Sequence, residues 1–454
     1  MSAHQARLTK GPVGKHLIDM TIPVFFGVFT MMLQGFADAF FIGMVGDWEL
    51  AALSFAYPIL MIVMSVAIGL GAGTSSVVAR AIGANDSTRA ARLATDSLLL
   101  SFIITGSISF LGILTIDSLF LSLGAPKEMI PLIRGYMEIL YLGVPFVVVG
   151  MVGMSSMRAT GDTRLPSLLM ISASIANIII DPIMIFGLGP IPAMGLKGAA
   201  MAALIARGAI FLGTIYFMNQ RLNMLSYEKP TLSEIKSSWI DILHVGIPAA
   251  ATNTIIPIAT AIITAMLAKY GPEAVAGFGV ASRIESVVLV MFYSLSAIIG
   301  PFVGQNLSAK KSERIYLALK QCSVFCLIFG LIFSYFLVAF RDSLPLLFSQ
   351  NVTVIKSASL FLLIAPISYG AYGVVMTMNA AFNGMGKPVP AVAISLIRMI
   401  VIYVPMAYFL QYFLGISGIY LSYAIANIVS GVVAYNWAKY SVPGQIKRVR
   451  YSNY

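Results

Sequence analysis

The sequence predicts an all-α integral membrane protein whose twelve transmembrane helices form two six-helix bundles, related by a pseudo-twofold axis along the membrane normal. Three observations predict this fold: the composition, the spacing of the apolar segments and an internal repeat. Of the 454 residues, 59% are hydrophobic and only 10% are charged, and the mean hydropathy is +0.89. A soluble domain carries about 25% charged residues, so the composition excludes an ordinary soluble protein.

The apolar segments are long enough to cross a bilayer, which takes roughly 20 residues of helix. Only helices and closed barrels satisfy their backbone hydrogen bonds in lipid, and segments of this length indicate helices. The expected spans are residues 20–45, 50–79, 93–116, 135–157, 165–187, 198–218, 240–268, 274–303, 321–340, 357–382, 388–413 and 416–438.

The distribution of basic residues predicts the orientation. With the N-terminus taken as cytoplasmic, 20 of the 29 Lys and Arg residues, including Lys447, Arg448 and Arg450, fall in cytoplasmic segments, and six fall in external ones. By the positive-inside rule, both termini are expected in the cytoplasm, in a multi-pass protein of a prokaryotic cell (inner) membrane. The net charge of +11 then reflects this orientation, and no nucleic-acid partner is expected.

The internal repeat relates the first half of the chain to the second at offsets of 225, then 223, then 220 residues. Aligned pairs include Pro23 with Pro248, Arg89 with Arg314, Pro182 with Pro405 and Gly195 with Gly415. Six spans per half give both halves the same orientation, so the repeat is parallel. We expect an N-lobe at residues 1–218, a cytoplasmic linker at 219–238 and a C-lobe at 239–454. Paired bundles of this kind rock for alternating access, so transport is the default function.

Two carboxylates lie deep in predicted spans, where an ionisable residue is costly and therefore indicates function. Asp38 in the first span and Asp181 in the fifth each lie six or seven residues, about 10 Å, from the external end. Each has an amide four residues earlier, Gln34 and Asn177, and this spacing places both groups on one helix face. If the two faces meet in one cavity, burial and mutual repulsion disfavour two ionised carboxylates, which suits a proton carrier.

Other interpretations of these acids remain open. Asp38 could cap or pair locally, and Asp181 could simply precede a proline near a helix end. Tyr136 and Glu138 could line the same cavity or form an interfacial pair. Pro23 lacks an amide donor and can bend the first helix, which would link protonation of Asp38 to cavity shape; a static kink is the alternative.

The second half has no counterpart of the two acids, because the aligned positions are Ile263 and Val404. We therefore expect ion coupling in the first half alone. Four further charged residues in spans are interpreted as structural. Arg283 and Glu285 are expected to pair with each other or with neighbouring helices, while Arg207 and Arg398 are expected to snorkel or to bind lipid headgroups.

Several motifs of enzymes are missing from the sequence. It contains no GxxxxGK[ST] loop to hold phosphates, no HExxH and no cluster of cysteine ligands. Cys322 and Cys326 are four residues apart in an apolar run and are interpreted as packing residues. We expect neither ATP hydrolysis nor any other enzymatic activity, and no cofactor; an integral-membrane enzyme would need a metal or nucleophile cluster.

Over nearly its whole length the chain resembles the multidrug and toxic compound extrusion (MATE) transporters, specifically their DinF-like branch. The motifs that carry this resemblance are GFADAFFIGMVG, NIIIDPIMIFGLG, RATGDTRLP, GVASRIES and FNGMGKPVPA. The resemblance implies a V-shaped pair of lobes and a cation-coupled antiporter that exports cationic or amphipathic compounds. It also assigns the family's first-helix aspartate to Asp38 and its fifth-helix Asn-x-x-x-Asp to Asn177 and Asp181.

The coupling ion is expected to be a proton, with Na⁺ at Asp38, Asn177 and Asp181 as the alternative. Similar proteins often carry a threonine in the sixth span, where this chain has Ala203, so a hard cation would have one oxygen ligand fewer. The C-lobe acids of the NorM-like branch have no match either. We expect a monomer in contact with membrane lipid, exporting small cationic or amphipathic molecules; a flippase for a lipid-linked saccharide or another lipid is the competing function.

Overall fold

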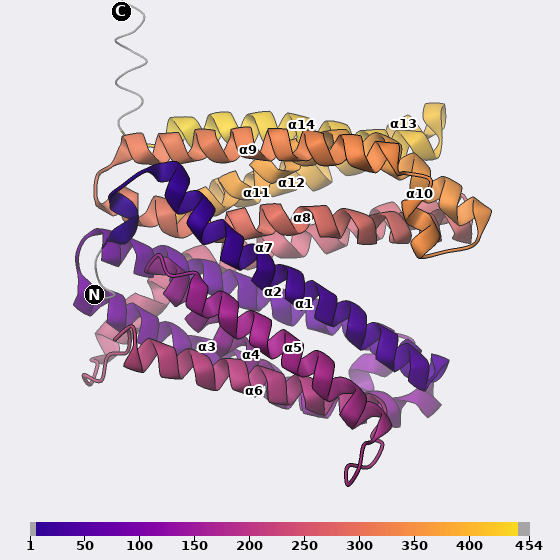
Figure 1. The fold of residues 1–454 in the computed structure, drawn as a ribbon, viewed down its shortest axis with the longest axis horizontal. Coiled ribbons are helices and arrows are strands. Elements are labelled where there is room, and N and C mark those ends of the chain that lie inside the picture. The colour runs from indigo at the N-terminus through magenta and orange to yellow at the C-terminus, as the bar shows by residue number, and fades with distance from the viewer. Residues whose placement is uncertain (1–5, 444–454) are drawn as a thin grey trace, which may run out of the picture. The chain divides into compact units, whose positions relative to one another are not determined.

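The computed structural model describes residues 6–443, so Lys447, Arg448 and Arg450 of the charge count lie outside the described residues. Within this range the regular structure is helical, apart from an isolated bridge between Leu188 and Ile191. Twelve segments of the described chain are long and apolar enough to cross a membrane (Figure 1). The prediction of an all-α protein with twelve spans is therefore confirmed.

The first six spans are single helices. They are α1 (Val13–Val45), α2 (Asp47–Gly83), α3 (Ser87–Ser122), α4 (Ile130–Ala159), α5 (Arg164–Phe186) and α6 (Leu196–Gln220), with the short 3₁₀ turns η1 (Arg7–Thr9) and η2 (Lys127–Met129) before α1 and α4. Spans seven to nine are α7 (Leu232–Ala268), α8 (Pro272–Ser308) and α9 (Ser312–Ala339).

The last three spans include two that are interrupted. The tenth consists of α10 (Val352–Ile364), η4 (Ala365–Ser368) and α11 (Tyr369–Gly384), and follows the 3₁₀ turn η3 (Leu344–Leu347). The eleventh consists of α12 (Pro388–Leu396), the π-helical segment η5 (Ile397–Tyr403) and α13 (Val404–Leu414), and the twelfth is α14 (Ile416–Ser441). Proline lies in the first turn of both η4 and α13, and because it has no amide hydrogen it removes one intrahelical hydrogen bond at each interruption.

The helices contact one another within two compact units. The first unit contains residues 22–250, and the second contains residues 8–21 and 251–443. The start of α1 thus packs with the second half of the chain, and the first part of α7 packs with the first half. Pro23 and Pro248, which the repeat aligns, both lie close to the point where their helix passes from one unit to the other.

The early start of α7 has a local cause, since this helix begins inside the stretch predicted as linker. Thr231 and Glu234 form a capping box: the Thr231 amide donates to Glu234 Oε2 at 2.7 Å, and the Glu234 amide donates to Thr231 Oγ1 at 3.3 Å. This reciprocal pair satisfies free amides at the N-terminus of a helix. The helix therefore starts at Leu232, eight residues before the expected span.

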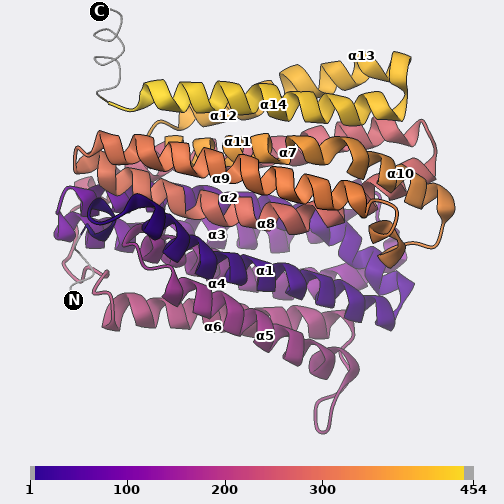
Figure 2. The same ribbon diagram turned by 45° about the horizontal axis from the view of Figure 1, so that its top comes forward.

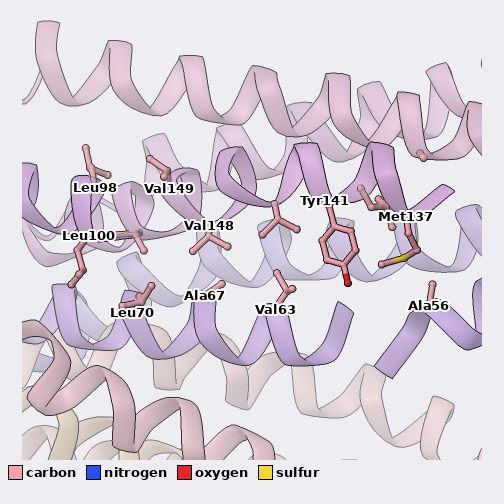
Figure 3. Packing of buried hydrophobic residues seen from close by; sticks show 14 of the residues in the cluster. Ala56, Val63, Ala67, Leu70, Leu98, Leu100, Met137, Tyr141, Val148 and Val149 are labelled. Atoms are coloured by element: carbon pink, nitrogen blue, oxygen red, sulfur yellow. The ribbon is translucent and has the colours of Figure 1, made fainter. Parts of the chain in front are cut away.

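In the first unit, α4 packs against α2, α3 and α6. Figure 3 shows Val63, Ala67 and Leu70 of α2 facing Tyr141 and Val148 of α4. The start of α7 packs on another part of α2, where glycines let the backbones approach closely. A Cβ atom on Gly69 would lie 2.5 Å from the Gly246 carbonyl oxygen. Such small residues are what allow helices to associate in lipid, where apolar burial gives little driving force.

Two repeat-related arginines hold the starts of the exchanged helices. Arg314 Nη1 donates to the Gly11 carbonyl oxygen at 2.6 Å, and Nη2 donates to that of Leu8 at 2.9 Å. At the aligned position, Arg89 donates to Ser238 Oγ at 3.1 Å and forms an ion pair with Asp241 at 3.2 Å.

The turns that precede these arginines match as well, because Asn85 and Lys310 both have positive φ, at 61° and 56°. The sequence repeat is therefore also a structural repeat. In the second unit, α11 lies against α8, α9 and α14 (Figure 2).

Candidate functional site

A cluster of polar side chains lies in the first unit where α1 and α5 face each other. The carboxyl groups of Asp38 and Asp181 are in hydrogen-bonding contact, and Gln34 also contacts Asp38. Asp181 is only 1% exposed, whereas Asp38 is half-buried. Asp181 Oδ2 is buried without a hydrogen-bond partner among the described residues. A buried carboxyl oxygen of this kind is costly to leave unpaired, which points to a ligand or a proton at this place.

The sequence brings the two acids together through the packing of their helices. Gly27 of α1 lets Met170 of α5 approach closely, since a Cβ on Gly27 would lie 3.3 Å from its sulfur atom. At the start of α5, Asp162 Oδ1 accepts from the amides of Arg164 and Leu165 at 2.9 and 3.2 Å. This side chain thus caps α5 and fixes where it begins, and with it the height of Asp181 along the helix.

Asn177 links the acid pair to a third helix. With its side-chain amide oriented by its neighbours, Nδ2 donates to Asp38 Oδ1 at 3.1 Å and Oδ1 accepts from the Ala203 backbone amide of α6 at 3.2 Å. Its amide nitrogen lies 2.7 Å from the amide of Gln34. The structure therefore places all four predicted residues in one cluster, with both acid-plus-amide faces turned toward each other.

Two further side chains belong to this cluster. Tyr136 of α4 is buried, and its hydroxyl is within electrostatic range of Asp38 and Asp181. Arg207 of α6 interacts electrostatically with both Asp38 and Tyr136. The expectation that Arg207 snorkels toward lipid headgroups is wrong, because its charge acts on Asp38 and Tyr136. No sequence pattern signals this interaction, since a single arginine in a span has the same pattern in either case.

Glu138 lies elsewhere. It pairs with Arg134 at 3.1 Å, and Arg134 also pairs with Asp117 of α3 at 2.6 Å. All three side chains are more than 40% exposed. Tyr136 and Glu138 are two residues apart, so they lie on different faces of α4, and only Tyr136 faces the acid pair.

A second polar cluster lies in the second unit and was missed. Arg398 is only 2% exposed and donates to Asn427 Oδ1 at 2.8 Å, so the expectation that it reaches lipid headgroups is wrong. Glu285 Oε1 accepts from the Tyr423 hydroxyl at 2.8 Å, whereas Arg283 is exposed and makes no ion pair with any described residue. Glu285 thus pairs with neighbouring helices and not with Arg283.

The first cluster has the chemistry of a proton-exchange site. Two carboxyls in contact inside a membrane are far more stable with a shared proton than with two negative charges. The same groups could offer oxygen atoms to a cation. Ala203 contributes no side-chain oxygen, and the Asn177 oxygen already accepts a hydrogen bond.

Comparisons with known proteins agree with the repeat and the fold. The family model described as MatE matches residues 23–183 and again 248–409, so both matches begin at the aligned prolines. An FAD transporter of Shewanella oneidensis is 37% identical over 432 residues, covering 95% of this chain and 96% of that protein. The probable multidrug resistance protein YoeA of Bacillus subtilis is 26% identical and covers 87% and 88%.

Solved structures are similar over the same length. The Vibrio cholerae MATE transporter VcmN in its bent form has a TM-score of 0.89 at 31% identity, covering 94% of this chain and 97% of that one. A transporter of the MOP superfamily from Pyrococcus furiosus, whose structure is described as having a binding pocket of reverse polarity, has a TM-score of 0.89 at 27% identity, covering 97% and 98%.

Proposed function

Since the chain belongs to the MATE family of efflux transporters, we propose that it is an antiporter that exchanges protons for organic substrates by alternating access. The chain is a multi-pass membrane transporter and not an enzyme. The observation that carries the proposal is the contact between the carboxyl groups of Asp38 and Asp181 in the interior of the first unit. Within the family we infer that it belongs to the DinF-like branch, because α7 has no carboxylate beyond Asp241, near the cytoplasmic end of its span.

In the proposed cycle, substrate binds while the Asp38–Asp181 pair carries negative charge, and a proton then neutralises Asp38. Loss of that charge weakens the hold on a positively charged substrate, which leaves on the external side. Moving one elementary charge across the membrane is worth about 2.3 kcal/mol per 100 mV, so ordinary membrane potentials can drive this exchange.

Protons are favoured over Na⁺ as the coupling ion because of the ligands at the site. Hard cations are bound by several oxygen atoms. The side-chain oxygen of Asn177 already accepts a hydrogen bond from the Ala203 backbone amide, and the Ala203 side chain has no oxygen atom to offer. A proton needs only the two carboxyl groups, which already touch.

Two substrate classes are supported by different observations. The paired acids favour cationic or amphipathic drugs, and two of the relatives are named for multidrug resistance or export. The relative at 37% identity is named for FAD, an anionic dinucleotide. A lipid flippase for anionic headgroups is less favoured, because the first-unit cluster holds two carboxyls against one arginine.

The test uses proteoliposomes that contain a pH-sensitive dye, with either ethidium or FAD as the transported probe. We expect one of the two probes to drive proton movement in the opposite direction, unchanged when choline replaces Na⁺ and abolished by a protonophore. Empty liposomes give the baseline. Transport that requires Na⁺ would contradict the choice of ion, and movement of a fluorescent lipid without either probe would favour the flippase.

We also infer that both termini face the cytoplasm, from the 20 to 6 excess of basic residues in the segments on that side. Single cysteines can test this, once the two native buried cysteines are replaced. A cysteine at Ser226, in the segment between α6 and α7, should react with a membrane-impermeant thiol reagent only after the cells are opened. A cysteine at Ser349, between η3 and α10, should react in intact spheroplasts, and the reverse result would invert the topology.

A further inference from the structure

The second-unit cluster around Glu285 and Arg398 is not used by the function proposed above. Glu285 lies thirteen residues after Pro272, the first residue of α8, which is about 20 Å along the helix axis. Arg398 lies sixteen residues before Leu414, the last residue of α13, at a similar depth. Both charges therefore lie in the middle part of their spans, where ionisable groups are costly and usually functional.

Glu285 accepts a hydrogen bond from a neutral donor and forms no ion pair with a cation. The Tyr423 hydroxyl of α14 donates to Oε1 at 2.8 Å, and the Tyr369 hydroxyl of α11 lies near the carboxyl group but is buried without a hydrogen-bond partner among the described residues. No ion pair involves Glu285 in the part of the chain that the structure describes. The residue is half-buried.

Arg398 is a fixed positive charge beside this carboxyl. Its Nη1 donates to Asn427 Oδ1 at 2.8 Å, and Asn427 Nδ2 in turn donates to Ser368 Oγ at 3.0 Å. The guanidinium lies 4.2 Å from the centre of the Tyr372 ring. Its Nε is buried and has no partner among the described residues. Because an arginine stays protonated in proteins, this charge persists throughout transport and acts electrostatically on Glu285.

The backbone at Arg398 is unusual. The residue lies in the seven-residue π-helical segment η5, and π-helical turns occur mostly as isolated bulges at functional sites. The repeat aligns this span with α5, the helix that carries Asn177 and Asp181 in the first unit. The two halves thus place opposite charges on corresponding helices: a buried acid on one and a buried arginine on the other.

We propose that Glu285 is a second proton-exchanging carboxyl, and that Arg398 is the positioning charge that draws its proton away. The groups facing Glu285 are Arg398 with Tyr403 from the eleventh span, Tyr369 with Tyr372 from α11, Tyr423 from α14, and Tyr293 from α8 itself. The ionised carboxylate offsets the charge of Arg398. Protonation leaves the arginine uncompensated, so the cluster gains one positive charge.

A static ion cluster would be built differently. A glutamate that only neutralises Arg398 would form a contact ion pair, because that geometry best repays the cost of burying two charges. In the structure the carboxyl accepts a hydrogen bond from the Tyr423 hydroxyl, a group that can donate to a carboxylate and accept from a carboxylic acid. The hydrogen bond between Glu285 and Tyr423 can therefore persist in either protonation state of the carboxyl. This inference rests on the proposed proton coupling and extends it, because it assigns a proton-exchanging carboxyl to the second half of the chain.

Infrared difference spectra of the reconstituted full-length protein test this directly. Acidification from about pH 8 to about pH 5, the range in which a proton carrier must work, should produce a band from protonated carboxyl groups. Glu285→Gln should remove one component of that band, and Asp38→Asn a different one. In Arg398→Gln the Glu285 component should appear at a proton concentration about tenfold lower, because a nearby unit charge has been removed.

The controls separate this inference from the proposed function. Glu273→Gln, near the start of the same helix, should leave the components of Asp38 and Glu285 unchanged. Tyr423→Phe, a milder change than Arg398→Gln, should shift the frequency of the Glu285 component because one hydrogen bond is lost. A Glu285→Gln spectrum identical to the wild type over the whole range would show that Glu285 stays ionised and would overturn the inference. If the wild-type spectrum lacked only the Asp38 component, the result would count against the proposed function and would leave the inference about Glu285 intact.

Discussion

Replacing Asp38 by asparagine is expected to abolish substrate-driven proton movement in proteoliposomes, while the protein still inserts and folds. Asparagine has nearly the same shape and can keep a hydrogen bond to Asn177 and to Asp181, but it cannot take up or release a proton. Insertion should not suffer, because a neutral side chain is less costly in a membrane than a charged one. The measurement is the change in internal pH on addition of whichever probe the wild type transports.

Asp181→Asn should act in the same direction but less completely. Asp38 is half-buried and keeps Gln34 and Asn177 as partners, so it can still exchange a proton without Asp181. We expect a loss on the order of tenfold, which corresponds to about 1.4 kcal/mol in the barrier.

Asp117→Asn is the matched control for both variants, since Asp117 is also an acid in a span but is exposed and paired with Arg134. Its proton movement should equal that of the wild type. Normal proton exchange by Asp38→Asn would remove Asp38 from the coupling mechanism.

Replacing Gly73 by valine should lower the free energy of unfolding by about 3 kcal/mol, the upper part of the range for overpacked sites. A Cβ atom on Gly73 would overlap the Ile242 carbonyl oxygen and approach the Gly246 amide nitrogen to 3.1 Å. Both are backbone atoms of α7, which cannot move aside as a flexible side chain can. The first part of α7 would be forced away from α2. Thermal unfolding of the purified protein in detergent measures the loss.

Gly106→Val on α3 is the control for this variant. A Cβ atom at Gly106 would have no heavy atom of the described chain within 4 Å, so the added side chain meets only solvent or lipid. Both substitutions place the same β-branched residue in a helix, and their difference therefore isolates the contact with α7. Equal stability of the two variants would show that α2 and α7 do not depend on this close approach.

Hydropathy and charge spacing predicted the spans well, because lipid imposes one length and one backbone structure on every crossing segment. The depth of Asp38 and Asp181 could also be predicted, since both lie near the ends of helices that run in the same direction. Their amide partners follow from the spacing of four residues along a helix. These relations are local, or set by the membrane itself.

The predictions that failed concern side chains whose contacts depend on which face of a helix packs against which neighbouring helix. The position of Arg398 in the sequence gives its depth but not its direction, so a buried arginine and a snorkelling one look alike. Arg207 presented the same ambiguity. Glu285 accepts a hydrogen bond from Tyr423, which lies 138 residues further along the chain, and no local sequence pattern predicts such a contact. Likewise, the exchange of helix starts depends on tertiary packing, although the repeat had already aligned Arg89 with Arg314.

The contacts made by the start of α1 also set an order in time. Leu8 donates its backbone amide to Gln305, which is 297 residues later in the chain, and its carbonyl oxygen accepts from Arg314. At a synthesis rate of 5–20 residues per second, roughly 15 to 60 s pass before these partners exist. The start of α1 can therefore make these contacts only after much of the second half has been synthesised. By contrast, Arg89 has already been synthesised when the start of α7 is made. Assembly of the two related halves is thus unequal. The first unit gains the start of α7 as soon as that segment is synthesised, whereas the second unit must bind the start of α1, a segment that was synthesised much earlier.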